Sequence, residues 1–224
     1  MEDYLKAIYY VQSRSNGARV RTSEIADHLD VTSPTVTSML TKLASKGYID
    51  HEKYNGASLT EDGERVALRI LRNHRLLEVY LTTELGYQLS EVHEEADRLE
   101  HYISDRLGDR LAETLDNPET DPHGAPIPTP SLRLTNMHTG EMLTTFDEGV
   151  TVTIQEVSDH DEALLEYLSE YGIAPETSIT IEEVAPFGMR TIRIHDNGET
   201  VSLPDGAARL IWATPTEKLM VERD

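Results

Sequence analysis

Two short amphipathic segments separated by a tight turn constrain the fold of this chain more than any other feature of its sequence. The first follows Thr22 or Ser23, both favoured helix N-caps, and places the apolar residues Ile25 and Leu29 on one face. The second begins with Pro34, because proline suits the first turn of a helix, and continues with helical spacing of its apolar residues. Two such helices joined by about four residues predict a helix-turn-helix.

The residues on either side extend this motif. Residues 2–14 have the apolar spacing of an amphipathic helix. Beyond the second helix, residues 48–51 and 57–60 flank a Tyr-Asn-Gly turn and indicate a β-hairpin wing. Residues 1–63 are therefore predicted to form a winged helix-turn-helix, a type of domain that reads double-stranded DNA.

The charge of the chain is distributed unevenly. A net charge of −21 argues against a nucleic-acid partner, because DNA binders present cations to the phosphates. Residues 1–60, however, contain seven acidic and seven basic residues, so the whole negative excess lies beyond them. The front of the chain is thus the part expected to approach DNA. An acid-rich chain with only five lysines also indicates a host with high internal salt, such as a halophilic archaeon, where repulsion is screened.

The second helix of a helix-turn-helix enters the major groove with its N-terminal side chains. Here these side chains offer hydroxyl and methyl groups, and they lack the bidentate Arg, Asn or Gln that discriminates strongly between bases. We therefore expect specificity to depend partly on DNA shape, with nearby basic residues, including Lys46, contacting phosphates. The predicted DNA-binding residues are Arg19, Arg21, Thr32, Ser33, Pro34, Thr35, Thr37, Ser38, Lys42 and Lys53.

Beyond the wing the pattern changes from helical to β. Two long helical patterns, one after Thr60 and one from Ser90 to about Leu115, predict a helical middle domain. Five prolines between residues 117 and 130 predict a linker or an ordered loop. From about residue 140, short runs rich in Val, Ile and Thr around one helix predict a small SH3-like β-barrel.

These changes set the expected domain organisation of an α+β chain. No window reaches the roughly 18 consecutive apolar residues that a membrane span needs, and the N-terminus lacks the features of a signal peptide. A soluble, cytoplasmic protein without a membrane partner is therefore expected. The predicted parts are the winged helix-turn-helix (1–63), the helical domain (64–117), a proline-rich linker (118–139) and the barrel (140–224).

Candidate metal ligands concentrate in the helical domain. His74 and Glu78 are one helical turn apart and share a face of the first long helix. Packing of the two long helices would bring them to a second ligand set, and a bundle core of His and carboxylates is a usual metal site. Because the chain has no cysteine, any metal must be held by nitrogen, oxygen or thioether. At 100° per residue, the second helix presents four candidate ligands on one face: His93, Asp97, Glu100 and His101.

Other interpretations of these residues are open at this point. Helix-surface His and Glu are common, and each of these side chains taken alone is more often solvated. A metallohydrolase would use the same residues to activate a water molecule, but no nucleophile or phosphate-binding motif accompanies them. A winged-helix regulator that senses a small ligand without metal is the second alternative. The wing favours a regulator over an enzyme.

Four segments stand in a fixed order along the chain: MEDYLKAIYY, TSPTVTSMLTKLASKGYI, NHRLLEVYL and HEEADRLEH. In this order and spacing they resemble the DtxR/MntR family, which comprises regulators like the diphtheria toxin repressor and the manganese transport regulator. The segment PHGAPIP and a C-terminal domain similar to FeoA or SH3-like domains extend the resemblance over essentially the whole chain.

The resemblance implies a homodimer that uses its helical domain for dimerisation and metal binding, and that represses metal-uptake genes by binding operator DNA when loaded with Mn²⁺ or Fe²⁺. It implies no enzymatic activity, and it leaves open whether one dimer or two bind each operator. It also implies two metal sites per subunit. The primary site would use Asp3, Asp97, Glu100 and His101, and the ancillary site His74, Glu78, His93 and, from the barrel, Asp161, with His160 or Glu162 as alternatives.

Two departures from the family pattern bear on the choice of metal. Iron-type members supply a Met and a Cys where this chain has Asp3 and Asp97. Carboxylates are hard ligands that suit Mn²⁺, whereas thioether and thiolate favour softer ions, so we expect Mn²⁺ ahead of Fe²⁺. Manganese-type members carry a Glu at the position of Lys6, which leaves the two-metal arrangement of that branch open for this chain.

The primary ligands implied by the resemblance come from two domains. Asp3 belongs to the first helix of the DNA-binding domain, whereas Glu100 and His101 belong to the helical domain. A metal that bridges them would set the spacing of the two recognition helices in a dimer, and so favour the DNA-binding state. Because Asp3 is only two residues from the start, we expect it to fray without metal, and the sequence leaves open whether residues precede Met1.

Overall fold

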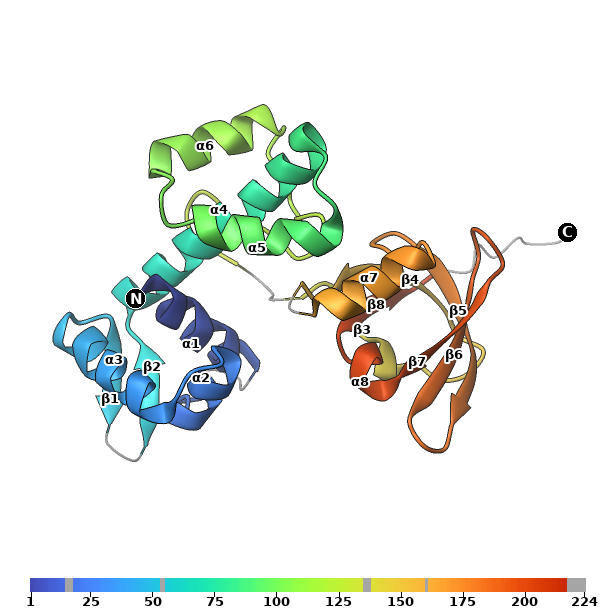
Figure 1. Cartoon of the computed structure of the whole chain (residues 1–224), viewed down its shortest axis with the longest axis horizontal. Coiled ribbons are helices and arrows are strands. Elements are labelled where there is room, and N and C mark those ends of the chain that lie inside the picture. Colours follow the sequence, from blue (N-terminus) through green and yellow to red (C-terminus); the bar gives the residue numbers. More distant parts are fainter. Residues whose placement is uncertain (15–17, 53–54, 135–137, 160, 217–224) are drawn as a thin grey trace, which may run out of the picture. The chain divides into compact units, whose positions relative to one another are not determined.

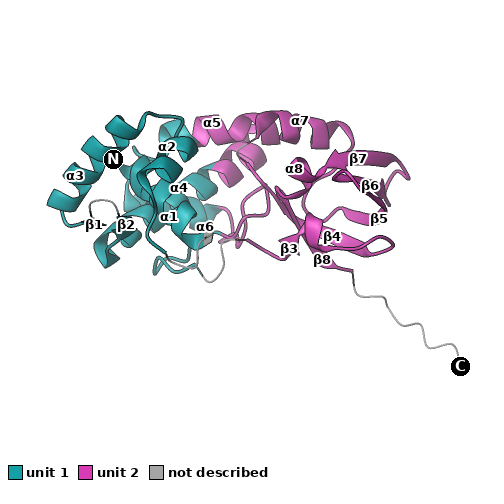
Figure 2. Cartoon of the chain, turned by 90° about the horizontal axis from the view of Figure 1, so that it is seen from below, with its two compact units in different colours: residues 1–77, 97–114, 127–135 teal, residues 78–96, 115–126, 136–224 magenta. Residues whose placement is uncertain are grey.

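The computed structural model describes residues 1–14, 18–52, 55–134, 138–159 and 161–216. The chain divides into two compact units, each built from several segments of the sequence (Figure 2). Unit 1 comprises residues 1–77, 97–114 and 127–135, and unit 2 comprises residues 78–96, 115–126 and 136–224. Within the described ranges, no helix combines the length and the apolar character needed to cross a membrane.

The predicted winged helix-turn-helix is confirmed in unit 1 (Figure 1). The wing is an antiparallel hairpin in which Ile49 pairs with Leu59, and Val20 adds a short bridge to Ala57. The elements are α1 (Glu2–Arg14), α2 (Thr22–His28), α3 (Ser33–Ser45), β1 (Ile49–Glu52) and β2 (Gly56–Leu59).

The apolar faces predicted from the spacing form one core in this domain. Ile8 of α1, Ile25 of α2 and Leu40 of α3 are fully buried in the same cluster. Gly56 opens the second strand of the wing with a positive φ of 93°, and a Cβ there would lie 2.4 Å from the carbonyl oxygen of Val20. Glycine is therefore required where the wing meets the bridge to Val20.

The first long helix, α4 (Glu61–Leu85), begins after Thr60 as expected. The Thr60 hydroxyl accepts a hydrogen bond from the amide of Gly63, which caps the helix, and donates one to the carbonyl of Gly47. A Cβ at Gly63 would lie 1.9 Å from the carbonyl oxygen of Tyr48, so the helix start packs directly on the backbone that precedes β1.

The second long helix of the prediction is wrong in its length. The chain forms α5 (Leu89–Leu99), a turn, and α6 (Asp105–Thr114) in place of one helix to about Leu115. The amide of Tyr102 donates to the carbonyl of Leu99, which tightens the turn, and the Ser104 hydroxyl accepts from the amide of Leu107 at the start of α6. Ser104 is thus an N-cap inside a helical pattern, and Glu100 and His101 lie in the turn rather than on a helix face.

The proline-rich segment is ordered where it is described. In unit 2, one carboxylate oxygen of Asp121 accepts from the amides of His123 and Ala125, and Thr120 bridges to Pro126. In unit 1, the guanidinium of Arg72 donates to the carbonyl of Pro128 at 2.6 Å. Side-chain hydrogen bonds to the backbone therefore stabilise this segment, which forms neither helix nor sheet.

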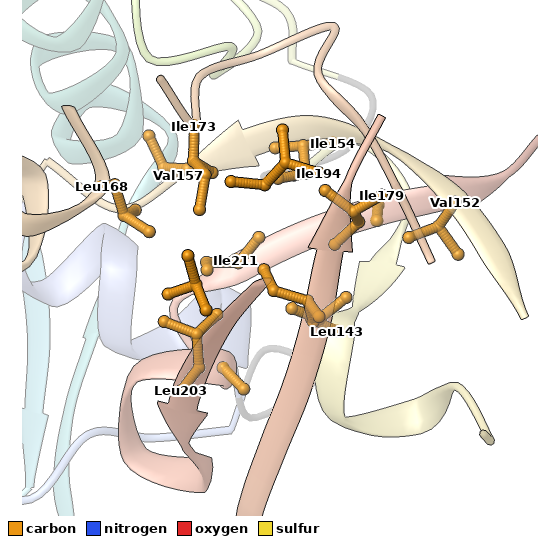
Figure 3. Packing of buried hydrophobic residues seen from close by; sticks show 14 of the residues in the cluster. Leu143, Val152, Ile154, Val157, Leu168, Ile173, Ile179, Ile194, Leu203 and Ile211 are labelled. Atoms are coloured by element: carbon orange, nitrogen blue, oxygen red, sulfur yellow. The ribbon is translucent and has the colours of Figure 1, made fainter. Parts of the chain in front are cut away.

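The C-terminal part of unit 2 is an antiparallel sheet with strand order β3-β8-β4-β5-β6-β7. Alternating apolar residues face a single core, in which Ile154, Ile179 and Ile211 are buried (Figure 3). The elements are β3 (Glu141–Met142), η1 (Leu143–Thr145), β4 (Thr151–Val157), α7 (Glu162–Glu170), β5 (Ser178–Ala185), β6 (Met189–Ile194), β7 (Thr200–Pro204), α8 (Asp205–Ala208) and β8 (Ile211–Pro215). This is the predicted SH3-like type of domain, with its one longer helix near the expected position.

Candidate metal centres and nucleic-acid interface

Unit 1 brings together the ligands that the resemblance assigns to the primary site. Nε2 of His101 lies 2.6 Å from Oδ1 of Asp3, and 3.5 Å from Oε1 of Glu100. Glu100 is only 1% exposed and is the shared member of two overlapping groups of donor atoms. We define the primary cluster as Asp3, His74, Asp97, Glu100 and His101.

His74 lies in this cluster, and the ancillary role that the resemblance implies for it stays a prediction. Its Nδ1 is 2.7 Å from Oε2 of Glu100 and 3.2 Å from Oδ1 of Asp97. Burial by itself would raise the pKa of Asp97, but its hydrogen bond to His74 and the charge of Lys6 lower it well below the usual range. Asp97 is therefore a carboxylate rather than a carboxylic acid, as a metal ligand must be.

A lysine also enters the primary cluster. The ammonium of Lys6, on α1, donates to Oδ1 of Asp97 at 2.8 Å and to both carboxylate oxygens of Glu100 at 2.9 and 2.8 Å. Burial would lower the pKa of Lys6, but the charges of Glu100 and Asp97 raise it overall. The lysine is therefore held in its charged form among the carboxylates.

The ring of His101 is oriented from its other side. Its Nδ1 lies 2.9 Å from Oε2 of Glu2, while the second carboxylate oxygen of Glu2 accepts from Arg69 of α4 at 3.1 Å. A carboxylate on one ring nitrogen directs the opposite nitrogen toward the ligand position, as is usual for metal-binding histidines. Here that nitrogen is the one beside Asp3.

The primary cluster fits a divalent cation by its donor chemistry. The donor atoms of Asp3, Glu100 and His101 lie within 4.8 Å of one another. Oxygen and nitrogen ligands bind such ions at about 2.2 Å, so two donors on opposite sides of an ion are about 4.4 Å apart. Small side-chain shifts are therefore sufficient to place all three around one ion.

Unit 2 contains a second group of candidate ligands around Glu78, which is fully buried. Nδ1 of His93 lies 3.5 Å from Oε1 of Glu78 and 3.3 Å from Oδ2 of Asp159, and Nδ1 of His123 lies 3.7 Å from Oε1 of Glu78. Asp121 joins Glu78 and His123 in a group whose donor atoms lie within 4.8 Å. We define the secondary cluster as Glu78, His93, Asp121, His123 and Asp159.

His123 is a buried imidazole of this cluster with a raised pKa. Its Nε2 lies 3.0 Å from the carbonyl oxygen of Leu89. Burial would lower the pKa of His123, but the neighbouring Glu78 carboxylate, with smaller contributions from Asp121 and Asp159, raises it to about 9. An incoming cation would therefore exchange with a proton at this residue.

Three members of the secondary cluster were not among the predicted ligands, and Asp161, which was predicted, lies outside it. Asp121, His123 and Asp159 come from loops, so no helical spacing indicated them, although the first two lie in or beside the PHGAPIP segment. Asp161 is exposed and caps α7 by accepting from the amide of Leu164 at 3.0 Å. Glu162 is also exposed, and His160 lies outside the described residues.

The predicted DNA-reading residues of α3 lie on its exposed side. Several of their hydroxyls have partners within the helix: Thr37 donates to the carbonyl of Ser33 at 2.9 Å, and Thr32 and Thr35 share a hydrogen bond of 2.9 Å. The exposed residues of this surface are Thr32, Ser33, Pro34, Thr35, Thr37, Ser38 and Lys42. The surface therefore presents small polar and methyl groups beside one cation.

The other predicted cations have different environments. Arg19 donates to the carbonyls of Asp50 and Gly56 and forms an ion pair of 2.8 Å with Glu52, so it braces the wing. Arg21 is exposed at the start of α2, where its amide donates to Glu24 at 2.6 Å. Lys53 lies outside the described residues.

Three family comparisons cover most of the chain. Residues 1–57 match the N-terminal DNA-binding domain of iron-dependent repressors, and residues 60–129 match their metal-binding and dimerisation domain. Residues 142–215 match the FeoA domain. Among curated proteins, the iron-dependent repressor IdeR of Mycobacterium tuberculosis is 31% identical over 94% of each chain, and the diphtheria toxin repressor of Corynebacterium glutamicum is 28% identical over 96% of each.

The chain belongs to the DtxR/MntR family of metal-dependent repressors.

Solved structures of this family have the same fold. A manganese-dependent transcriptional repressor in complex with manganese is 35% identical, with a TM-score of 0.86 over 96% of this chain and 99% of the other. ScaR with bound Zn²⁺ is 31% identical, with a TM-score of 0.81 over the same shares. As a DtxR/MntR-family member, the chain is a metal-dependent DNA-binding repressor, and the family is one of transcriptional regulators rather than enzymes.

Proposed function

We propose that this chain is a Mn²⁺-activated repressor, which binds operator DNA as a homodimer in the cytoplasm, with Fe²⁺ as the alternative activator. The observation that carries this proposal is the meeting of Asp3, on the first helix of the DNA-binding domain, with Glu100 and His101 of the metal-binding domain. The donors are carboxylates and imidazoles, which suit Mn²⁺ better than the softer ions that thiolates select.

In this proposal Asp3, Asp97, Glu100 and His101 hold the primary ion, with His74 beside them. A bound ion would supply positive charge and directed bonds among carboxylates that otherwise repel each other. Asp3 then ties α1 to the turn after α5, and Glu2 with Arg69 keeps the ring of His101 in position. These side chains thus fix the position of α1 relative to the metal-binding helices.

We further propose the secondary cluster as the ancillary site. Glu78 and His93 were expected there, and Asp121, His123 and Asp159 complete a set of oxygen and nitrogen donors. Asp159, rather than Asp161, is proposed as the ligand from the C-terminal domain, because its carboxylate lies beside His93 while that of Asp161 caps α7.

For the DNA side, we propose that α3 enters the major groove and that the wing lies along the phosphate backbone. In a dimer, two copies of α3 would read half-sites about one helical turn apart, or a multiple of it. Lys42 is the exposed cation of α3 among the predicted contacts.

The test begins with selection of duplexes from a random DNA library by the Mn²⁺-loaded protein. Binding of a selected duplex is then followed by fluorescence anisotropy in Mn²⁺, Fe²⁺ under anaerobic conditions, Mg²⁺ or EDTA, at fixed salt, because affinity for DNA depends steeply on salt. Tight binding with Mn²⁺ that is lost in EDTA supports the proposal. Equal binding in EDTA would indicate the metal-independent, ligand-sensing alternative.

A matched pair of variants connects the response to the primary cluster. Glu100→Gln removes a buried carboxylate of the cluster, whereas Glu162→Gln changes an exposed carboxylate of α7. We expect the first variant to lose Mn²⁺-dependent DNA binding and the second to retain it. The same response in both variants would contradict the assignment of Glu100.

A further inference from the structure

The primary cluster contains a cation of its own. We propose that Lys6 is a built-in counter-cation that limits the primary cluster to one divalent ion, and that an ion can chelate Glu100 only by displacing the ammonium. The inference rests on the proposed metal-dependent function. It gives Lys6, which is not a metal ligand, a role in that function. It makes Lys6 a determinant of metal stoichiometry and affinity.

The contacts of Lys6 are those of a bound cation. An ammonium has three N–H donors, and here three carboxylate oxygens, one from Asp97 and two from Glu100, lie 2.8–2.9 Å from Nζ. The side chain is 14% exposed, and that of Glu100 is 1% exposed. The ammonium is therefore almost removed from water and held by carboxylates in place of hydration.

The position of Nζ decides how Glu100 can bind a metal. An ammonium nearly equidistant from both carboxylate oxygens lies where a chelating ion would lie. The oxygen Oε2 is also 2.7 Å from Nδ1 of His74. An ion can chelate Glu100 only if Lys6 leaves, and with Lys6 in place it has only single oxygens of Glu100 to bind.

The charges of the cluster indicate one ion. Asp3, Asp97 and Glu100 contribute three negative charges, and Lys6 contributes one positive charge, which leaves two negative charges for one divalent ion to balance. Glu2 does not change this balance because Arg69 pairs with it. Replacing Lys6 with a carboxylate would leave four negative charges, which is the charge that two divalent ions balance.

The sequence places Lys6 for this role. Asp3 and Lys6 are three residues apart on α1, so both side chains lie on the face of the helix that meets the cluster. Lys6 thus ties α1 to Asp97 and Glu100 through its own charge, while Asp3 does so beside His101. A purely structural ion pair would need neither the contact of Nζ with both oxygens of Glu100 nor a net charge of two negative units left for a metal ion.

The experiment counts Mn²⁺ ions bound per full-length chain by equilibrium dialysis and elemental analysis, without DNA. The variants are Lys6→Glu, Lys6→Met and Lys6→Arg, and the control is Arg193→Met, which removes an exposed arginine paired with Glu182 in the C-terminal sheet. We expect one more ion for Lys6→Glu than for the unchanged chain. We expect an unchanged count and about tenfold tighter Mn²⁺ binding for Lys6→Met, because a competing charge is gone. Lys6→Arg and the control should keep the original count.

Two further readouts locate the effect in the cluster. Electron paramagnetic resonance of Mn²⁺-loaded Lys6→Glu should show the broadened signal of two coupled ions, which an additional ion elsewhere on the surface would not give. In EDTA, Lys6→Met should melt at a lower temperature than the unchanged chain, and Mn²⁺ should raise its melting temperature by a larger amount.

The outcomes separate this inference from the proposed function. If the unchanged chain binds no Mn²⁺, the proposed function fails. If it binds Mn²⁺ while Lys6→Glu keeps the same count and Lys6→Met the same affinity, the function stands and the inference is overturned. Should Lys6→Glu fail to fold, the Mn²⁺ affinity of Lys6→Met and its melting temperature with and without Mn²⁺ still decide the question.

Discussion

Asp3 and His101 lie 2.6 Å apart, carboxylate oxygen to ring nitrogen, although one begins the DNA-binding domain and the other follows the fifth helix. Lys6, on the same helix as Asp3, meets Asp97 and Glu100, so two side chains of α1 bring the recognition domain to the metal-binding helices. We expect a divalent ion held by Asp3 and His101 to strengthen this connection.

Removal of this carboxylate should weaken the response to metal without unfolding the chain. We expect Asp3→Asn to reduce the Mn²⁺-dependent affinity for a selected duplex at least about tenfold, because one charged ligand and the tie to α1 are lost. Fluorescence anisotropy against Mn²⁺ concentration measures this effect. Asp196→Asn, an exposed position in the C-terminal domain, serves as the control, and equal behaviour of the two variants would refute the role of Asp3.

Two aspartates near the start of α7 should have different roles, one in metal binding and the other in helix capping. Asp159→Ala is expected to weaken Mn²⁺ binding at the secondary cluster about tenfold, since its carboxylate lies beside His93. Asp161→Ala should leave metal binding unchanged and cost about 1 kcal/mol of stability, because it removes an N-cap. Metal titration and urea denaturation of both variants check this pair, and loss of metal binding in Asp161→Ala would show that the assignment is reversed.

The pH should act on the metal-free chain through His123. Because the pKa of His123 is raised to about 9, its protonated form stabilises the fold fully below the unfolded pKa near 6.5. This stabilisation should be lost as pH rises from about 6.5 to about 9. Urea denaturation in EDTA across that window should show a larger loss for the unchanged chain than for His123→Gln. Parallel curves would contradict a role for this residue.

Two glycines near the wing should tolerate a methyl group very differently. At Gly63 a Cβ would lie 1.9 Å from a backbone carbonyl oxygen, so Gly63→Ala is expected to cost about 3 kcal/mol or more. At Gly47, with a φ of 78° and no atom within 4 Å of the added Cβ, alanine should cost about 1–2 kcal/mol. The free energy of unfolding from denaturant curves compares them, and equal losses would mean that the contact at Gly63 relaxes.

Substitution of two cations in the DNA-binding domain should affect different properties, DNA affinity for one and stability for the other. Lys42→Ala is expected to weaken binding to all duplexes alike and to reduce the salt dependence by about one counterion. Arg19→Ala should instead lower the stability of the domain, because Arg19 holds backbone carbonyls of both wing strands and Glu52. Salt titrations of binding, together with thermal melts, separate the two. A loss of stability in Lys42→Ala would argue against a phosphate contact.

The sequence predicted those parts of the fold that depend on local patterns. Caps at Thr60 and a proline at the start of α3 are local signals, and they located the helices correctly. The break between α5 and α6 was missed because Ser104, an N-cap, stands inside a longer pattern that still has helical spacing. Periodicity alone does not reveal a turn that preserves it.

The same limit applies to the candidate metal ligands. His74, Glu78 and His93 were predicted because helical spacing places ligands on one face. Asp121, His123 and Asp159 come from loops, and spacing along a loop does not predict which side chains will be in contact. Their placement depends on long-range packing, such as the hydrogen bond from the amide of Val157 to the carbonyl of His123.

The hydroxyl groups of the recognition helix have one more consequence. Because Thr37 donates its proton to the backbone of α3 and Thr32 and Thr35 share one between them, these residues offer a groove mainly lone pairs and γ-methyl groups. A surface of methyl groups recognises the C5-methyl of thymine through apolar contact. Since 5-methylcytosine carries the same methyl group at the same edge, enzymatic methylation of a cytosine in an operator would present this helix with a feature it otherwise finds only on thymine.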